Sequence, residues 1–254
     1  MKYINTISES KLYHADNNDI LCNLPAYSFS VMITDPPYNF TKSATQKVYK
    51  ETSKRLVSKS ALYDYQDGGE NCRIKSKFGA EDIEKFLKQV PRLMRKMNAF
   101  VFCSEDQLAF YSSWAARHGY KFAVLVWEKP VTIISKRRFS QNVEFIVRIY
   151  ESGTALNNVD DVELYNRVFH SKAVRNKQHP TQKPLEIFER IIRLTTMPGD
   201  AVLDPFLGSG TTAVAAKKLG RFYVGIERND EFFSTAEKRV AETTEPRAEL
   251  NLFA

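Results

Sequence analysis

Residues 201–212 read AVLDPFLGSGTT, and this stretch decides the fold. Its apolar start predicts a buried strand that ends at Asp204, and a helix opens at Thr211. Between them, Gly208 and Gly210 let the backbone approach a ligand closely, and the helix N-terminus offers unpaired N–H groups. A strand, a glycine turn and a helix in this order are typical of a cofactor-binding loop in an α/β protein.

The next predicted strand ends at Glu227, 23 residues beyond Asp204. An acid at that place can accept hydrogen bonds from ribose hydroxyls, a pattern that by itself also fits NAD. Three departures disfavour a dinucleotide: the spacing is not Gly-x-Gly-x-x-Gly, Phe206 occupies the turn, and the loop begins with an acid. An acid attracts an ammonium group, such as that of a methionine moiety, and repels a pyrophosphate.

A second signature, Asp35-Pro36-Pro37-Tyr38, directly follows the apolar run 29–34. A strand that ends in an acid, two rigid prolines and an aromatic ring predicts a stiff polar pocket with a flat apolar lid, as chemistry on an extruded nucleobase requires. The alternative interpretation is a rigid turn without chemistry, because short motifs of this kind also occur by chance.

Strand and helix patterns alternate along the chain, which predicts a parallel sheet covered by helices on both faces. The short join between two strands at 122–127 and 143–150 predicts a hairpin at one sheet edge. We expect one domain over residues 1–254, with a basic insertion at about 41–77 and a segment of little periodicity at 152–178. The other expected strands are 11–15, 29–34, 99–103, 201–203 and 222–226, and the expected helices are 18–24, 80–97, 106–118, 185–195, 211–219 and 230–241.

A third motif, His179-Pro180-Thr181-Gln182-Lys183-Pro184, lies just upstream of the glycine loop. Together the three motifs resemble the amino-methyltransferases of DNA that use S-adenosylmethionine. Because the base-pocket motif precedes the cofactor loop, the order resembles the permuted β class, and the resemblance covers about residues 11–240. It implies a Rossmann-like methyltransferase fold, with a mostly parallel seven-stranded sheet, an antiparallel edge hairpin and helices on both faces.

The resemblance also implies roles for individual residues. The loop from Asp204 holds the methionine part of the cofactor, Glu227 binds the ribose, Asp16 binds the adenine amino group, and the segment around Lys183 closes over the carboxylate end. A helix N-cap is the alternative for Asp16, and a phosphate contact or a solvated charge is the alternative for Lys183. The predicted cofactor-binding set is Asp16, Asp35, Thr181, Lys183, Asp204, Phe206, Gly208, Gly210, Thr211, Thr212 and Glu227.

The predicted catalytic set is Asp35, Pro36, Pro37 and Tyr38. An exocyclic amino group is a poor nucleophile, and acceptors against its N–H bonds keep electron density on the nitrogen. We expect the Asp35 carboxylate and the Pro36 carbonyl to be these acceptors, while Tyr38 stacks on the flipped base. Methylation at a ring carbon is disfavoured, because in the known family it needs a cysteine that follows a proline, and no cysteine does so here. The four histidines show no metal-ligand spacing.

Net charge is +7, which favours a polyanionic partner such as DNA. The excess is concentrated beside the motifs: segment 41–77 holds nine basic and four acidic residues, and segment 167–183 holds five basic residues and no acid. A flexible charged loop is the alternative for each segment. The predicted DNA-binding residues are Lys47, Lys50, Lys54, Arg55, Lys136, Arg137, Arg138, Arg175 and Lys177. The short segment 151–178 is the expected target-recognition region.

The leading hypothesis is a sequence-specific adenine-N6 DNA methyltransferase of bacterial or phage type. An N4-cytosine enzyme is the first alternative, although such relatives usually carry Ser in place of Asp35. A methyltransferase of RNA or of a protein amide and an inactive nucleic-acid-binding relative are the others. The resemblance leaves open a homodimer and a cognate restriction endonuclease. Three scattered cysteines, no signal sequence and no membrane-length apolar run predict a cytoplasmic protein.

Overall fold

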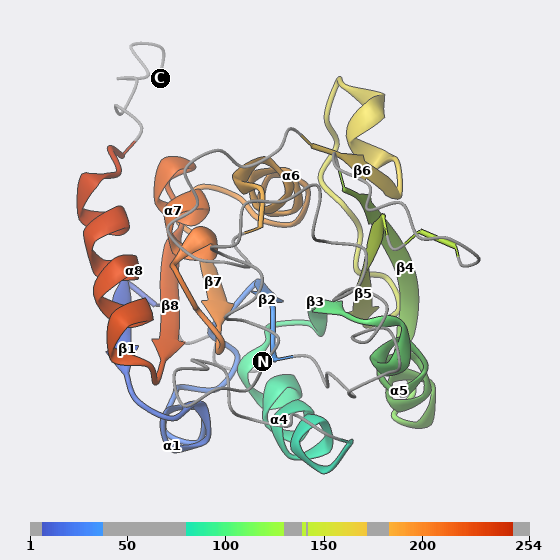
Figure 1. Cartoon of the computed structure of the whole chain (residues 1–254), viewed down its shortest axis with the longest axis horizontal. Coiled ribbons are helices and arrows are strands. Elements are labelled where there is room, and N and C mark those ends of the chain that lie inside the picture. Colours follow the sequence, from blue (N-terminus) through green and yellow to red (C-terminus); the bar gives the residue numbers. More distant parts are fainter. Residues whose placement is uncertain (1–6, 38–79, 130–138, 141, 172–182, 246–254) are drawn as a thin grey trace, which may run out of the picture.

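The computed structural model describes residues 7–37, 80–129, 139–140, 142–171 and 183–245 (Figure 1). Its strands are β1 (Lys11–His14), β2 (Val31–Thr34), β3 (Asn98–Cys103), β4 (Lys121–Glu128), β5 (Val143–Tyr150), β6 (Val168–His170), β7 (Ala201–Asp204) and β8 (Phe222–Glu227). Its helices are α1 (Asn17–Leu21), α4 (Ala80–Leu93), α5 (Glu105–Arg117), α6 (Leu185–Thr195), α7 (Thr211–Lys218) and α8 (Asp230–Glu242), with a 3-10 turn at Val162–Tyr165. None of these helices is long and apolar enough to cross a membrane.

The described strands form one eight-stranded sheet in the order β1-β8-β7-β2-β3-β5-β4-β6. Only β5 runs against its neighbours in this sheet, since its pairs with β3 and β4 are antiparallel and the other described pairs are parallel. The mostly parallel sheet and the β4–β5 hairpin are therefore confirmed.

Two details of the prediction were wrong. The sheet has eight strands and not seven, and the hairpin is not its edge, because β6 pairs with β4 on the outer side. The extra strand lies in segment 152–178, where we expected little regular structure. It has three residues, of which only Phe169 is buried, so its alternation is too short to stand out in the sequence.

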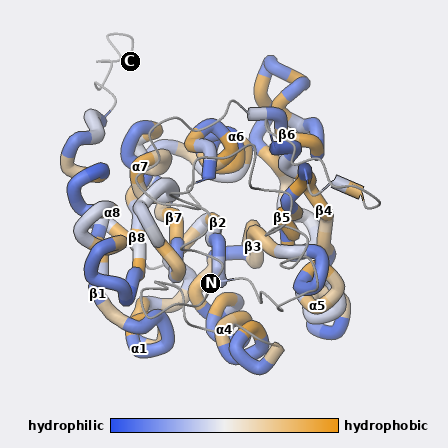
Figure 2. Tube along the Cα trace, in the orientation of Figure 1, coloured by the Kyte–Doolittle hydropathy of each residue, from blue (hydrophilic) through white to orange (hydrophobic). Residues whose placement is uncertain are grey.

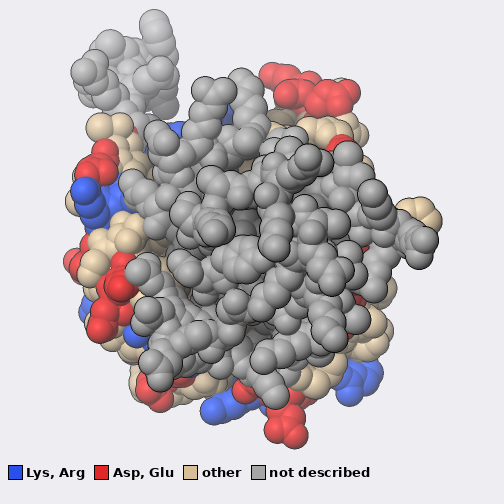
Figure 3. Space-filling view, viewed as in Figure 1, with Lys and Arg blue, Asp and Glu red and all other residues tan. Residues whose placement is uncertain are grey.

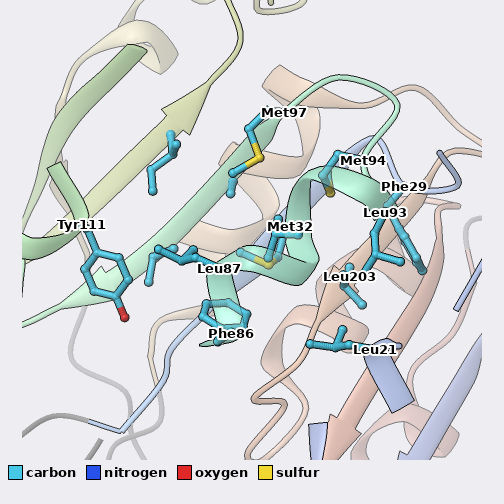
Figure 4. Close-up of a cluster of buried hydrophobic side chains, with 14 of the residues drawn as sticks. Leu21, Phe29, Met32, Phe86, Leu87, Leu93, Met94, Met97, Tyr111 and Leu203 are labelled. Atoms are coloured by element: carbon cyan, nitrogen blue, oxygen red, sulfur yellow. The ribbon is translucent and has the colours of Figure 1, made fainter. Parts of the chain in front are cut away.

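Helices cover both faces of the sheet (Figure 1). One apolar cluster packs α1, α4 and α5 against one face, and a second packs α6 and α7 against the other. In Figure 4, Phe86, Leu87 and Leu93 of α4 lie beside sheet residues such as Met32 and Leu203. The hydrophobic colour of Figure 2 gathers on the central strands, while much of α8 is hydrophilic.

Helix α4 ends at Leu93, four residues before the predicted end. The chain turns there because Met94 forms an isolated parallel bridge with Phe29, and the Arg95 N–H donates to the Phe29 carbonyl at 2.9 Å. These bonds replace the next helical turn, and they fix the entry to β2.

The centre of the sheet sets the place of the site. The chain leaves β7 for α7 on one face, whereas the next described helix after β2 is α4 on the other face. Strands β7 and β2 are parallel neighbours, so their carboxyl ends lie at a topological switch point. In open α/β sheets this is where ligands bind.

Candidate active site

Asp204 ends β7 at this switch point, and its carboxylate is only 4% exposed. Oδ1 accepts from the Thr34 hydroxyl at 2.8 Å and from the Phe206 N–H at 3.1 Å, and Oδ2 accepts from the Thr212 hydroxyl at 2.5 Å. Burial raises the pKa of Asp204 to about 7, although these hydrogen bonds work in the opposite direction. The carboxylate therefore joins β2, the loop and α7.

The loop after Asp204 is shaped by two glycines in the left-handed region, Gly208 with φ 53° and Gly210 with φ 84°. A Cβ on Gly210 would lie 2.9 Å from Cβ of Ala236 on α8, so only glycine fits where α7 begins. No described atom lies within 4 Å of the place that a Cβ on Gly208 would take. Within the described part of the chain, this side of the Gly208 backbone is therefore open.

The loop and the start of α7 also contact two other helices, α8 and α4. The Thr211 hydroxyl, buried at the start of α7, accepts from Arg239 of α8 at 3.2 Å. Phe206 packs edge-on against Phe86 of α4, with ring centroids 5.3 Å apart. The predicted cofactor loop is thus fixed by contacts to α8 and α4.

Glu227 and Asp16 stand at the ends of the paired strands β8 and β1. Glu227 accepts from the Gly208 and Asn229 N–H groups, each at 2.8 Å, which ties the glycine loop to β8. Asp16 is the N-cap of α1 and accepts from the backbone N–H of Asn18 at 3.0 Å. Burial alone would raise the pKa of Asp16, but the Asn18 hydrogen bonds and the Arg228 charge outweigh it and leave this pKa lowered. The N-cap alternative for Asp16 is thus observed, while the carboxylate remains charged.

Asp35 directly follows β2, and its side chain is 24% exposed. Lys183 Nζ lies 2.8 Å from its Oδ2. The Pro37 carbonyl accepts from the side-chain amide of Gln107 on α5 at 3.2 Å, so the turn through Pro36 is held at both ends. The acidic end of the predicted base pocket is partly open, and its backbone is fixed.

Lys183 itself is only 6% exposed, and a second carboxylate, Glu144 Oε2 on β5, lies 3.2 Å from its Nζ. Lys129 Nζ lies 3.0 Å from Glu144 Oε1. Asp35, Lys183, Glu144 and Lys129 thus form a row of alternating charges. In the structure Lys183 is thus a partner of Asp35; its predicted role in holding the cofactor stays a prediction.

Sequence reasoning did not single out Glu144 or Gln107. Glu144 appeared as one polar position of a strand, and Gln107 as one of many polar residues of a helix. Gln107 has a local signal only for the capping box that it forms with Ser104 at the start of α5. The contacts of Glu144 with Lys183 and of Gln107 with Pro37 have none, because these partners are 39 and 70 residues away along the chain.

The remaining predicted residues lie outside the described ranges. Figure 3 shows that basic and acidic side chains of described residues both occur around the periphery in that view. Among described residues, no cluster of His, Cys, Asp and Glu side chains could hold a metal ion. The predicted residues outside the described ranges are Tyr38, Thr181, Lys47, Lys50, Lys54, Arg55, Lys136, Arg137, Arg138, Arg175 and Lys177.

Comparisons with known proteins agree with this geometry. The N6_N4_Mtase family model, described as DNA methylase, matches residues 29–238. Type II methyltransferase M2.LlaDCHI of Lactococcus lactis subsp. cremoris is 29% identical over 248 residues, covering 90% of this chain and 88% of the relative. Type II methyltransferase M2.DpnII of Streptococcus pneumoniae is 30% identical over 251 residues, with the same coverage.

Solved structures give the same result. The complex of M1.HpyAVI with SAM superposes with a TM-score of 0.62 at 28% identity, covering 91% of this chain and 98% of that one. PvuII DNA methyltransferase, cytosine-N4-specific, has a TM-score of 0.70 at 18% identity, covering 92% and 87%, and that likeness shows the fold alone.

The site fits S-adenosylmethionine. Among the described residues, nothing fills the space beside the Gly208 backbone, and the Glu227 carboxylate, which has about four acceptor sites, uses two of them on the N–H groups described above. Fold, site and comparisons define an S-adenosylmethionine-dependent methyltransferase. The chain belongs to the DNA methylase family of N6 and N4 methyltransferases and is a DNA methyltransferase.

Proposed function

We propose that this enzyme methylates the N6 amino group of a flipped adenine within a specific DNA sequence. The observation that carries the proposal is the carboxylate of Asp35, which stands at the switch point, is partly exposed and is paired with a buried lysine. A carboxylate beside a cation stays ionised and is an acceptor only, whereas a serine hydroxyl can donate or accept. The carboxylate followed by Pro-Pro-Tyr resembles the adenine-modifying relatives.

Each residue of the turn has a task in this proposal. The Asp35 carboxylate and the Pro36 carbonyl accept hydrogen bonds from the two N–H groups of the amino group and so orient its nitrogen. Gln107 holds the next carbonyl, that of Pro37, and so keeps the turn in one shape. Tyr38, outside the described residues, stacks on the base on the evidence of sequence alone.

In this proposal the cofactor is held by the loop after β7 and by the acids that follow β1 and end β8. When bound, S-adenosylmethionine supplies an electrophilic methyl group. Asp16 and Glu227 accept hydrogen bonds from its nucleoside part, and the loop from Phe206 to Gly210 surrounds its amino-acid part. Lys183 and the buried groups Asp204, Thr211 and Thr212 keep the loops at the switch point in place, the last three through the hydrogen bonds described above.

The proposed setting follows from the relatives and the charge. Both curated relatives are named type II methyltransferases, and we place this enzyme in a comparable restriction-modification context in a bacterial or phage-infected cell. The basic residues of segments 41–77, 136–138 and 166–178 contact the DNA backbone and read the target. A homodimer and a cognate endonuclease are the proposed protein partners.

The test is the identity of the methylated base. Unmodified genomic DNA is incubated with the purified chain and S-adenosylmethionine labelled in the methyl group, digested, and separated into nucleosides. A mock purification from cells that lack the gene, prepared in parallel, shows how much label comes from a contaminating enzyme. We expect label in N6-methyldeoxyadenosine; label in N4-methyldeoxycytidine would overturn the base assignment and leave the family assignment intact.

A further inference from the structure

A row of charges joins Asp35, in the predicted base pocket, to Lys183 and Glu144. Lys183, from the chain just before α6, places its ammonium between Asp35 of the β2 loop, at 2.8 Å, and Glu144 of β5, at 3.2 Å. The lysine side chain is 6% exposed, and the carboxylates are 24% and 18% exposed. Three separate segments of the chain therefore meet at one cation.

The charges of this row depend on one another. Burial alone would lower the pKa of Lys183, but Asp35 and Glu144 outweigh burial and raise it, so the ammonium stays charged. Burial alone would raise the pKa of Glu144, but Lys183 and Lys129 lower it, so this carboxylate stays ionised too. A buried lysine with one partner removed leaves a charge that is poorly compensated.

We propose that Lys183 and Glu144 are positioning residues, which hold the Asp35 carboxylate ionised and in a single orientation toward the target amino group. The inference rests on the proposed role of Asp35 and adds residues that act through it. Lys183 engages Oδ2 and so fixes the plane of the Asp35 carboxylate. Glu144 in turn holds the ammonium, so that Lys183 is not drawn entirely to Asp35.

Other titratable groups face the row from the surrounding elements. Burial raises the pKa of the Cys103 thiol on β3 to about 12, and that of Tyr111 on α5 rises well above its usual value, so both remain neutral near pH 7. Asp204 on β7 also interacts with Asp35, and its pKa is about 7, so the pH profile of each variant is compared with that of the wild type. Among the described residues, the titratable groups that interact with Asp35, Lys183 or Glu144 are thus Lys129, Cys103, Tyr111 and Asp204.

Removing only the cation produces a specific pH effect. In Lys183→Met, Asp35 and Glu144 lose the cation that lies between them, while Lys129 still pairs with Glu144, so Asp35 is the carboxylate that we expect to bind a proton more tightly. Protonated Asp35 is a poorer acceptor, and turnover therefore falls as the pH is lowered. In the double variant Lys183→Met/Glu144→Gln the second carboxylate is absent, so the proton affinity of Asp35 returns toward its ordinary value.

The experiment measures single-turnover rates on DNA from pH 5.5 to 8.5, with calorimetric cofactor affinity, for the full chain and its variants. Lys183→Met should lose progressively more rate, relative to the wild type, as the pH is lowered from 8.5 to 5.5, with the largest loss at pH 5.5. The double variant should lose most of this pH dependence, and Glu144→Gln alone should be slower than wild type by a factor independent of pH. Lys218→Met, which breaks an ion pair between α7 and α6, is the control and should behave like the wild type.

Several results would overturn the inference. These are a pH-independent loss in Lys183→Met, the same pH dependence in the single and double variants, or a Lys183→Met defect confined to cofactor affinity. If Lys183→Met does not fold, a rate in Glu144→Gln that falls further toward acid contradicts it equally, since that variant keeps the lysine. Loss of turnover in Asp35→Ala together with wild-type behaviour of these variants rejects this inference alone, whereas an active Asp35→Ala rejects the proposed function.

Discussion

The loop after β7 and the loop after β2 lie side by side and each begins with an aspartate, but the two carboxylates are held in different ways. Asp204 is buried and receives bonds from neutral donors, two of them within eight residues along the chain. Asp35 is partly exposed and pairs with a lysine 148 residues away. Two of the three donors to the first carboxylate thus come from its own loop and helix, whereas the lysine beside the second comes from a distant segment.

The difference separates two tasks. Neutral donors hold Asp204 in place but leave its pKa raised to about 7, which suits a group that shapes a loop. A cation beside Asp35 favours its ionised form, which suits the proposed role of this carboxylate as an acceptor of hydrogen bonds from the substrate. The Thr34 hydroxyl, which bonds to Asp204 and precedes Asp35 in the chain, joins the two loops.

The largest expected effect is on turnover, and it distinguishes the proposed base pocket from the proposed cofactor site. Asp35→Ala should lower turnover by about 10²- to 10³-fold while cofactor affinity changes little, because it removes an acceptor used mainly in the transition state. Glu227→Ala should do the opposite and weaken cofactor binding. Single-turnover rates and calorimetry on both variants check this. Equal losses of affinity and rate in Asp35→Ala would place that residue in the cofactor site instead.

The second prediction concerns the rigidity of the loop after β7. Gly210→Ala meets both a left-handed backbone and a contact of 2.9 Å with Ala236, and should cost about 3 kcal/mol of unfolding free energy. Gly199→Ala is the matched control, since Gly199 has φ 82° and no described atom near its Cβ position, and should cost about 1–2 kcal/mol. Urea denaturation measures both; equal losses would show that α8 yields to the methyl group.

The same contrast explains what could be predicted from sequence. Strands β2 and β7, the glycine turn and the acids at Asp16, Asp35, Asp204 and Glu227 all have local signals, namely an apolar run followed by a polar residue or a turn. The structure places these groups at the carboxyl ends of the strands, as a parallel sheet requires. Local pattern and sheet geometry together were therefore enough to predict that these groups meet at one end of the sheet, while their roles stay predictions.

What sequence missed depends on pairing between distant segments. The role of Glu144 follows from the antiparallel register, in which Phe145 of β5 lies opposite Cys103 of β3, and this brings the start of β5 to the end of the sheet where Asp35 lies. Strand β6 owes its place to pairing with β4, since only its middle residue is buried. Neither pairing leaves a periodic trace in the chain.

The smallest predicted effect is a pH dependence of stability that comes from the buried Asp204 carboxylate. Because the pKa of Asp204 is raised from 3.8 to about 7 in the folded protein, the folded state binds a proton that the unfolded state has released, and stability contributed by this group is lost as pH rises toward 7. Between pH 5.5 and 8 the loss amounts to about 2 kcal/mol for a shift of this size.

Asp204→Asn removes this titration and keeps much of the hydrogen bonding. The amide oxygen can still accept from Phe206 and Thr34, and the Thr212 hydroxyl can turn to accept from the amide NH₂. Stability of the variant relative to wild type should therefore increase by about 2 kcal/mol from pH 5.5 to pH 8, as followed by urea denaturation at each pH. A difference that is constant over this range would mean that Asp204 is already ionised at pH 5.5, and the two aspartates would then differ in their partners but not in their protonation.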